Sequence, residues 1–110
     1  MRDAAVIPPV EQALRPTAAL TVLRGNLAPD TAVIKQAGVA EDMLRCQGPA
    51  VCFDAEEAAL EAIAAGRIAA GSVVVLRYLG PRGAPGMPEM LGATMALKLA
   101  GLGRTALITD

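Results

Sequence analysis

One acidic residue, Glu89, follows a segment that is rich in glycine and proline. Residues 80–90 read GPRGAPGMPEM and hold three glycines and three prolines. This composition excludes a regular strand and leaves only turn conformations until Pro88, a residue that suits the first position of a helix. We therefore expect Glu89 in a first helical turn, where the helix dipole favours the ionised carboxylate and makes it a suitable ligand for Mg²⁺. The alternative role is an acid that only stabilises its own helix, by ~0.3–1 kcal/mol.

The chain offers few other side chains for metal or nucleophilic chemistry. It contains no histidine and two cysteines, Cys46 and Cys52. Their spacing fits neither a redox pair nor half of a zinc site. We predict two partly buried, reduced thiols, because free cysteine is among the most buried residue types.

The elements that position Glu89 are predicted from the apolar pattern. The run from Val73 to Arg77 is β-branched and continuously apolar up to Leu76, which indicates a central strand that is buried on both faces and leads into the glycine-rich turn. Similar composition predicts strands at residues 20–23, 32–35, 51–53 and 105–109.

Two helices are expected between these strands. The first begins with a capping box of Asp54 and Glu57 and runs to about Ala65, with Gly66 as its C-terminal cap. Its buried face is predicted as Ala59, Leu60, Ile63 and Ala64, whereas Glu56, Glu57 and Glu61 are expected in solvent. The second helix starts at Pro88 and ends at Gly101 and Gly103, and its predicted packing face consists of Leu91, Met95, Leu99 and Leu102.

Length and charge limit the classes of protein to which the chain can belong. A chain of 110 residues with 54% hydrophobic residues can bury the core of one domain without disulfides. Residues 1–15 mix proline with charge and are predicted to be a linker or a cut junction. The net charge of −1 gives no reason to bind nucleic acid or an anionic membrane. Without a signal-like start or an apolar run approaching the ~20 residues of a membrane span, we expect a cytoplasmic protein.

Five short segments occur here in the order seen in one known family. From about Pro16 to the last residue, the chain resembles the dihydroxy-acid dehydratase and 6-phosphogluconate dehydratase family. The segments are residues 25–30 (GNLAPD), 48–50 with 53–57 (GPA and FDAEE), 80–90, 101–103 (GLG) and 106–110 (ALITD).

The resemblance implies a mixed α/β fold that is mainly β: a swivelling β/β/α barrel-like domain similar to the swivelling domain of aconitase. Residues 16–110 look like the C-terminal domain of a longer enzyme, truncated before a turn that carries the catalytic serine. That serine is expected beyond Asp110, so no catalytic residue is expected within this chain. The large N-terminal domain of such an enzyme holds an iron–sulfur cluster on cysteines and most of a Mg²⁺ site.

The resemblance also implies roles for the glycine-rich segment. Glu89 would be the one Mg²⁺ ligand that this domain contributes. The active-site turn that can contact substrate would comprise Gly80, Pro81, Gly83, Gly86 and Met87.

The implied activity is that of a hydro-lyase converting a 2,3-dihydroxy acid to a 2-oxo acid, with dihydroxy-acid dehydratase of branched-chain amino-acid biosynthesis favoured. The expected partners are the N-terminal cluster-binding domain, a small dihydroxy acid and further copies of the enzyme in a homo-oligomer. The isolated chain is expected to be inactive, because the cluster ligands and the serine are not in it.

Other interpretations remain open. Thr31, Leu79 and the segment Gly92-Ala93-Thr94 depart from the usual family pattern, which leaves a sugar-acid or 6-phosphogluconate dehydratase possible. A small structural subunit or lid of an aconitase-like assembly is a second alternative, as is a binding module of the same fold. The absence of histidine excludes a phosphohistidine carrier.

Overall fold

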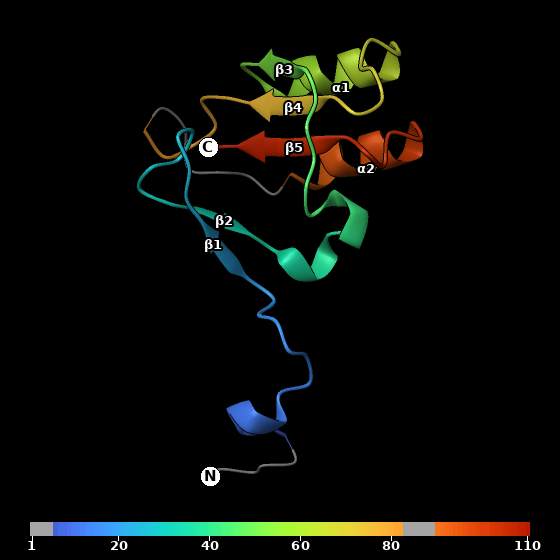
Figure 1. Ribbon diagram of the computed structural model, residues 1–110. Helices are drawn as coiled ribbons and strands as arrows, with labels where there is room; N and C mark the ends of the chain where they lie inside the picture. Colours follow the sequence, from blue (N-terminus) through green and yellow to red (C-terminus); the bar gives the residue numbers. More distant parts are fainter. Residues whose placement is uncertain (1–5, 83–89) are drawn as a thin grey trace. The chain divides into compact units, whose positions relative to one another are not determined.

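The computed structural model describes residues 6–82 and 90–110 (Figure 1). The chain divides into two compact units, Met1–Ala40 and Glu41–Asp110. Each unit has its own sheet, and each is described by itself below.

The first unit contains an antiparallel pair of strands, β1 (Thr21–Leu23) and β2 (Ala32–Ile34). Both strands lie where the sequence predicted them. Short 3₁₀ helices, η1 (Val10–Gln12) and η2 (Gln36–Gly38), precede and follow the pair. The Thr21 hydroxyl donates a hydrogen bond to Gln36 Oε1 at 2.6 Å. No residue from 6 to 40 is buried, and the prediction of a linker over residues 1–15 stays a prediction.

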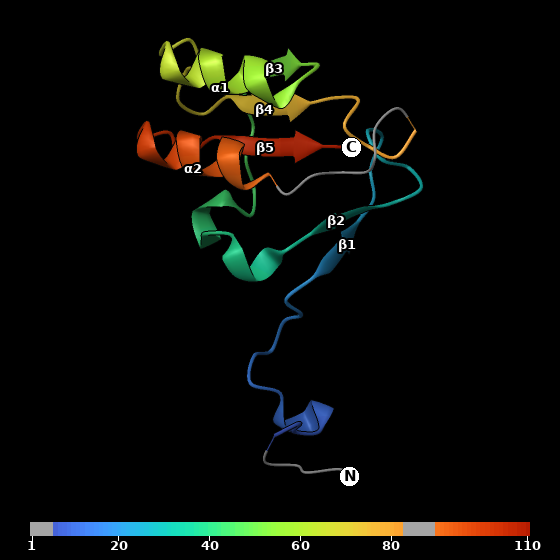
Figure 2. The same ribbon diagram turned by 180° about the vertical axis from the view of Figure 1, so that it is seen from behind.

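The second unit is built on a three-stranded parallel sheet in the order β3-β4-β5. Its strands are β3 (Ala50–Phe53), β4 (Val73–Leu76) and β5 (Ala106–Thr109), preceded by the 3₁₀ helix η3 (Glu41–Met43). The arrowheads of the three strands point the same way in Figures 1 and 2. The prediction that the Val73 strand is central is therefore confirmed. Val74 and Leu76 are fully buried, but Val73 and Val75 are only half-buried, so the expected burial on both faces is incomplete.

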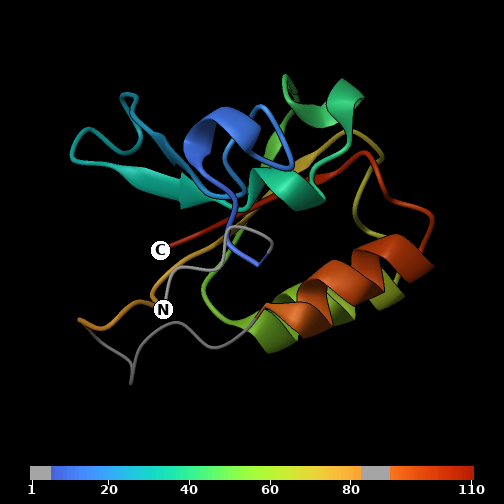
Figure 3. The same cartoon turned by 90° about the horizontal axis from the view of Figure 1, so that it is seen from below.

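A helix makes each crossover between neighbouring strands. Helix α1 (Glu56–Ala64) connects β3 to β4, and α2 (Leu91–Leu99) lies between β4 and β5. Figure 3 shows the two helices side by side on one face of the sheet. This layering is the βαβ arrangement that parallel strands require.

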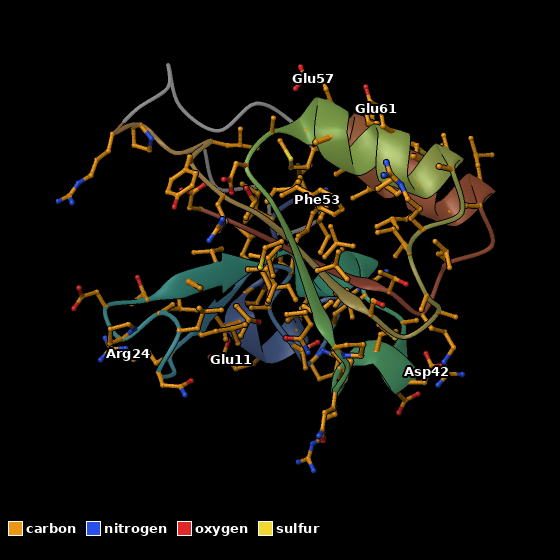
Figure 4. All side chains as sticks on the ribbon, turned by 90° about the horizontal axis from the view of Figure 1, so that it is seen from above. Glu11, Arg24, Asp42, Phe53, Glu57 and Glu61 are labelled. Atoms are coloured by element: carbon orange, nitrogen blue, oxygen red, sulfur yellow. The ribbon has the colours of Figure 1, made fainter. Side chains whose placement is uncertain are left out.

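The core lies between the helices and the sheet. Helix α1 contributes Ala59, Ala62 and Ile63, helix α2 contributes Ala93 and Leu97, and β4 contributes Val74 and Leu76. Phe53 of β3 packs against both buried clusters from its place beneath α1 (Figure 4). Small residues on both helices allow the helices and the sheet to approach closely.

The beginning of α1 differs from the prediction. The helix starts at Glu56 after the N-cap Ala55, and no side chain caps it. The expected capping box of Asp54 and Glu57 is therefore wrong, because Asp54 is instead bound by Arg77. On the predicted packing face Ala64 is exposed, and Ala62 takes its place in the core.

The ends of both helices follow the prediction. Gly66 (φ +66°) and Gly101 (φ +73°) adopt the left-handed conformation that ends a helix. The amide of the next residue, Arg67 or Leu102, then donates to a carbonyl of the last helical turn at 2.9 Å. This pattern is the Schellman motif, which explains why glycine is needed at both positions.

The predicted packing face of α2 is largely wrong. Leu91, Met95 and Leu99 are 57%, 45% and 82% exposed, whereas Ala93 and Leu97 are buried. Of the predicted face only Leu102, beyond the helix, packs against the core. The helix is apolar around most of its circumference, so its periodicity could not distinguish the buried face from the exposed one.

The cysteine prediction is half correct. Both thiols are free, but both side chains are exposed rather than partly buried. Val51 and Phe53 of β3 face the core, so Cys52 between them points to the other face of the strand.

The mixed α/β class is confirmed, but within the described residues helix and strand are similar in extent, so that part of the chain is not mainly β. Over residues 6–82 and 90–110 the strands form two separate sheets and close no barrel. Within the same residues, no helix has the length and apolar character needed to span a bilayer.

Candidate functional site

Three charged residues lie at the carboxyl ends of the parallel strands. Asp54 follows β3, Arg77 follows β4 and Asp110 follows β5. Because the strands are parallel, these ends meet at one edge of the sheet, the edge where ligands usually bind in open α/β sheets. The segment that leads into the glycine-rich turn leaves the sheet at this edge.

Asp110 holds the segment that follows β4. Its carboxylate accepts hydrogen bonds from the backbone amides of Tyr78 at 3.0 Å, Leu79 at 2.9 Å and Gly80 at 3.2 Å. These bonds, that from Leu79 above all, lower the pKa of Asp110 below its ordinary value of 3.8. The carboxylate is thus held in its ionised form by three successive amides.

The conformation of Tyr78 makes this contact possible. Its φ of +65° is left-handed, which is uncommon for a residue other than glycine. A left-handed residue in a loop can turn successive amides toward one acceptor, which creates an anion-binding concavity in the backbone. Here a carboxylate from the neighbouring strand occupies that concavity.

Gly80 lies directly against the end of β5. A Cβ atom on this residue would stand 3.1 Å from the carbonyl oxygen of Asp110. A side chain would therefore push the two strand ends apart, which gives a steric reason for glycine at this position. Gly80 is the buried residue from which the predicted turn begins, and Pro81 after it is exposed.

The remaining predicted site residues lie outside the described part of the chain. They are Gly83, Gly86, Met87 and Glu89. Helix α2 begins at Leu91 after the N-cap Met90, so it starts later than the predicted Pro88. The placement of Glu89 in a first helical turn and its role as a Mg²⁺ ligand lie outside the described residues and stay predictions.

An exposed ion pair occupies the other side of this edge. Arg77 donates to Asp54 Oδ1 from Nε at 2.8 Å, and its Nη2 lies 2.6 Å from the same oxygen. This hydrogen bond and the charge of Asp54 raise the pKa of Arg77. The guanidinium also lies 5.2 Å from the centre of the Tyr78 ring. The charges of Arg77 and Asp54 therefore neutralise each other at the solvent surface.

Glu56 joins the two helices. Its Oε1 accepts a hydrogen bond from the amide of Ala93, in the first turn of α2, at 3.2 Å. The prediction of a solvent-facing glutamate is thus wrong for Glu56, which is half-buried. It is right for Glu57 and Glu61, whose side chains point away from the sheet in Figure 4. Sequence periodicity could not reveal the role of Glu56, because its partner lies on another helix.

The described side chains alone do not form a metal centre. No group of three or more histidine, cysteine, aspartate or glutamate side chains comes together within residues 6–82 and 90–110. Asp54 and Asp110 are occupied by Arg77 and by backbone amides, respectively.

A groove of about 410 Å³ lies between β3 and α1. It is lined by Val51, Phe53, Ala58, Glu61, Ala62, Arg67 and Ile68.

Comparison with known proteins assigns the chain to a family. Residues 5–110 match the model of the dihydroxy-acid/6-phosphogluconate dehydratase C-terminal region. The chain is 52% identical over 109 residues to the dihydroxy-acid dehydratase of Syntrophotalea carbinolica. The aligned region covers 98% of this chain and 20% of the Syntrophotalea protein. The dihydroxy-acid dehydratases of Clostridium beijerinckii and Thermus thermophilus are each 55% identical over 106 residues, or 96% of this chain and 19% of those proteins.

The chain thus spans about one fifth of the length of the curated relatives that it matches. The matched region includes the whole second unit and its carboxyl edge. The chain belongs to the dihydroxy-acid/6-phosphogluconate dehydratase family, of which it represents the C-terminal region.

Proposed function

We propose that the chain is the C-terminal part of a dihydroxy-acid dehydratase, a hydro-lyase that converts a 2,3-dihydroxy acid to a 2-oxo acid. The observation that carries the proposal is the identity of 52–55% over nearly the whole chain to proteins with that name. The same identity favours a role in branched-chain amino-acid biosynthesis over the processing of sugar acids. A cytoplasmic location belongs to the same proposal.

The iron–sulfur cluster of such an enzyme must be held outside this chain. Clusters are usually held by four cysteine ligands, or by a mixture of cysteine and histidine, whereas this chain has two cysteines and no histidine. Both cysteines are exposed and no other metal-binding side chain is grouped with them in the described residues. We therefore assign the cluster to an N-terminal domain, against which this swivelling domain closes in a homo-oligomeric enzyme.

The Mg²⁺ ion fits the chain through one side chain. Glu89 supplies a carboxylate oxygen, the donor that Mg²⁺ prefers, and it is the only acid in the glycine-rich segment. When bound, the ion would act as a Lewis acid and orient the oxygens of the substrate. The residues of this chain would contribute one ligand, and Gly80 and the amides of Tyr78 and Leu79 define where the segment that leads to it leaves the sheet.

The test uses the full-length protein that carries this chain, purified without oxygen and assayed with two substrates. A short branched 2,3-dihydroxy acid is expected to be converted to its 2-oxo acid faster than a six-carbon phosphorylated sugar acid. The reverse preference would move the protein to the sugar-acid branch of the family. Absence of turnover with either acid, in a preparation with intact iron and sulfide, would refute the proposal.

Glu89→Gln tests the metal ligand within that enzyme. The amide keeps the shape of the side chain but not its charge, so turnover should fall at least ~100-fold with the cluster retained. The matched control is Glu57→Gln, because Glu57 is exposed on α1 and its loss should leave turnover unchanged. Near-normal turnover of the Glu89 variant at saturating Mg²⁺ would exclude the ligand role.

A further inference from the structure

One carboxylate holds the whole segment that connects β4 to the glycine-rich turn. Three successive amides, those of Tyr78, Leu79 and Gly80, donate to Asp110, and two of them share Oδ1. Beyond Arg77, whose amide still donates to Phe53 at 2.9 Å, the segment has left the ladder of the sheet. Its first three residues are therefore oriented by a side chain and not by strand pairing.

The contact links the ends of two neighbouring strands. Leu76 is paired with Thr109 in the parallel register, so Asp110 comes directly after the last paired residue of β5. Its side chain reaches across to the segment after β4, and a Cβ atom on Gly80 would stand 3.1 Å from the Asp110 carbonyl oxygen, which leaves little room for a side chain there. A displacement of either strand end would consequently displace the other.

Asp110 differs in this respect from the other charged groups at this edge. Asp54 is neutralised by Arg77, and both side chains are about half exposed. In the part of the chain that the structure describes, Asp110 makes no ion pair, and backbone amides are its partners. Such an arrangement suits a carboxylate whose task is to orient a loop.

We propose that Asp110 is a positioning residue of the dehydratase, which fixes the start of the glycine-rich turn. Glu89, the proposed Mg²⁺ ligand, follows that turn in the sequence. It acts through the backbone of residues 78–80 and touches neither substrate nor metal. We call the contact between Asp110 and these three amides the Asp110 clamp. The catalytic consequence of the clamp rests on the proposed function, but the clamp itself is independent of that function.

The clamp is tested first without any enzyme assay. In the 110-residue chain carrying a C-terminal amide, the amide resonances of Tyr78, Leu79 and Gly80 should shift together as the pH is lowered through one midpoint below 3.8. In Asp110→Asn this common shift should vanish, because the side chain no longer titrates. Asp54→Asn is the matched control and should keep the common shift. Independent or absent shifts in the unsubstituted chain would overturn the clamp.

The catalytic consequence is tested in the full-length enzyme. In Asp110→Asn the side-chain NH₂ group takes the place of the oxygen that accepts from the Tyr78 amide. Because the NH₂ group and the Tyr78 N–H are both donors, this hydrogen bond is lost. Loss of such a supporting contact typically costs about 10–100-fold in metal affinity or activity. We expect the Mg²⁺ concentration for half-maximal activity to rise by that factor, with unchanged iron and sulfide, and Asp54→Asn to leave it unchanged.

The two tests separate the possible failures. An Asp110→Asn enzyme with the wild-type Mg²⁺ requirement and turnover overturns the positioning role, even where the amide shifts reveal the clamp. Loss of turnover at every Mg²⁺ concentration, with Mg²⁺ affinity unchanged by direct titration, also overturns it, because that result indicates a direct catalytic role. If the unsubstituted enzyme dehydrates no dihydroxy acid, the proposed function fails, and the common amide shift still decides the clamp.

Discussion

The core of the second unit and the carboxyl edge of its sheet are held together by different forces. Between the helices and the sheet, the side chains of Ala59, Val74 and Ala93 are 0% exposed and belong to the apolar clusters of the core. At the edge, charged side chains that are largely exposed bind one another or the backbone. Burial supplies most of the folding free energy, whereas exposed polar contacts supply geometry. The fold and the site should therefore respond to substitution separately.

The largest effect is expected from the core. Leu76 is 1% exposed and packs with Ala59 and Ala93, so Leu76→Ala leaves a cavity at the centre of the second unit. We expect a loss of about 2–5 kcal/mol in the free energy of unfolding, measured by urea denaturation. The control is Leu99→Ala on α2, where the side chain is 82% exposed and the loss should stay within about 0.5 kcal/mol.

The same pair of variants tests the orientation of α2. If Leu99→Ala destabilised the protein as much as Leu76→Ala, the face predicted from the sequence would be the buried one after all. Sequence periodicity succeeded approximately for α1, because the charged residues Glu57 and Glu61 mark its solvent side. Helix α2 carries a single charge, Lys98, so its apolar residues lie on several faces and do not indicate an orientation.

A second effect is expected at the opposite, amino edge of the sheet. Gly48 precedes β3, and a Cβ atom there would stand 1.8 Å from the carbonyl oxygen of Gly71, which precedes β4. Because that neighbour is backbone, Gly48→Ala must separate the two loops, and we expect a loss of about 1–3 kcal/mol in the free energy of unfolding. Gly103→Ala is the control, since nothing lies within 4 Å of its added atom. Equal stability of both variants would show that the loops before β3 and β4 are not in contact.

A smaller effect is expected from the Asp110 clamp when the pH is lowered. The pKa of Asp110 is depressed in the folded chain, so the clamp stabilises the fold at pH values above about 3.8. This contribution is lost as the pH falls through the lowered pKa, since protonation removes the charge that the amides bind. Thermal unfolding of the amidated chain between pH 6 and pH 2 should show a steeper loss of stability than Asp110→Asn. Parallel curves for the two proteins would mean that the carboxylate gains nothing from the three amides.

The carboxyl edge was only partly predictable from the sequence. The strand Val73–Leu76 was correctly placed, because a continuous apolar run is a local signal. The role of Asp110 was missed, although a signal existed: parallel neighbouring strands bring the residues that follow them to one edge. The contact between Glu56 and Ala93 had no such signal, since it depends on how two helices pack. Asp54 was assigned to a helix cap because its partner, Arg77, follows another strand and is distant in the sequence.

The smallest effect on stability is expected from Asp54→Asn. Comparing this variant with Asp110→Asn shows which of the two aspartates organises the carboxyl edge. Asp54 and Asp110 both follow a strand at the same edge, but Asp54 binds an exposed guanidinium that also contacts the Tyr78 ring. Water and salt screen this pair, and the asparagine oxygen can still accept from Arg77, so the urea midpoint should not change measurably. Raising the salt concentration should likewise leave the difference between the two proteins near zero. A loss of stability equal to that of Asp110→Asn at pH 6 would show that the ion pair, and not the backbone clamp, organises this edge.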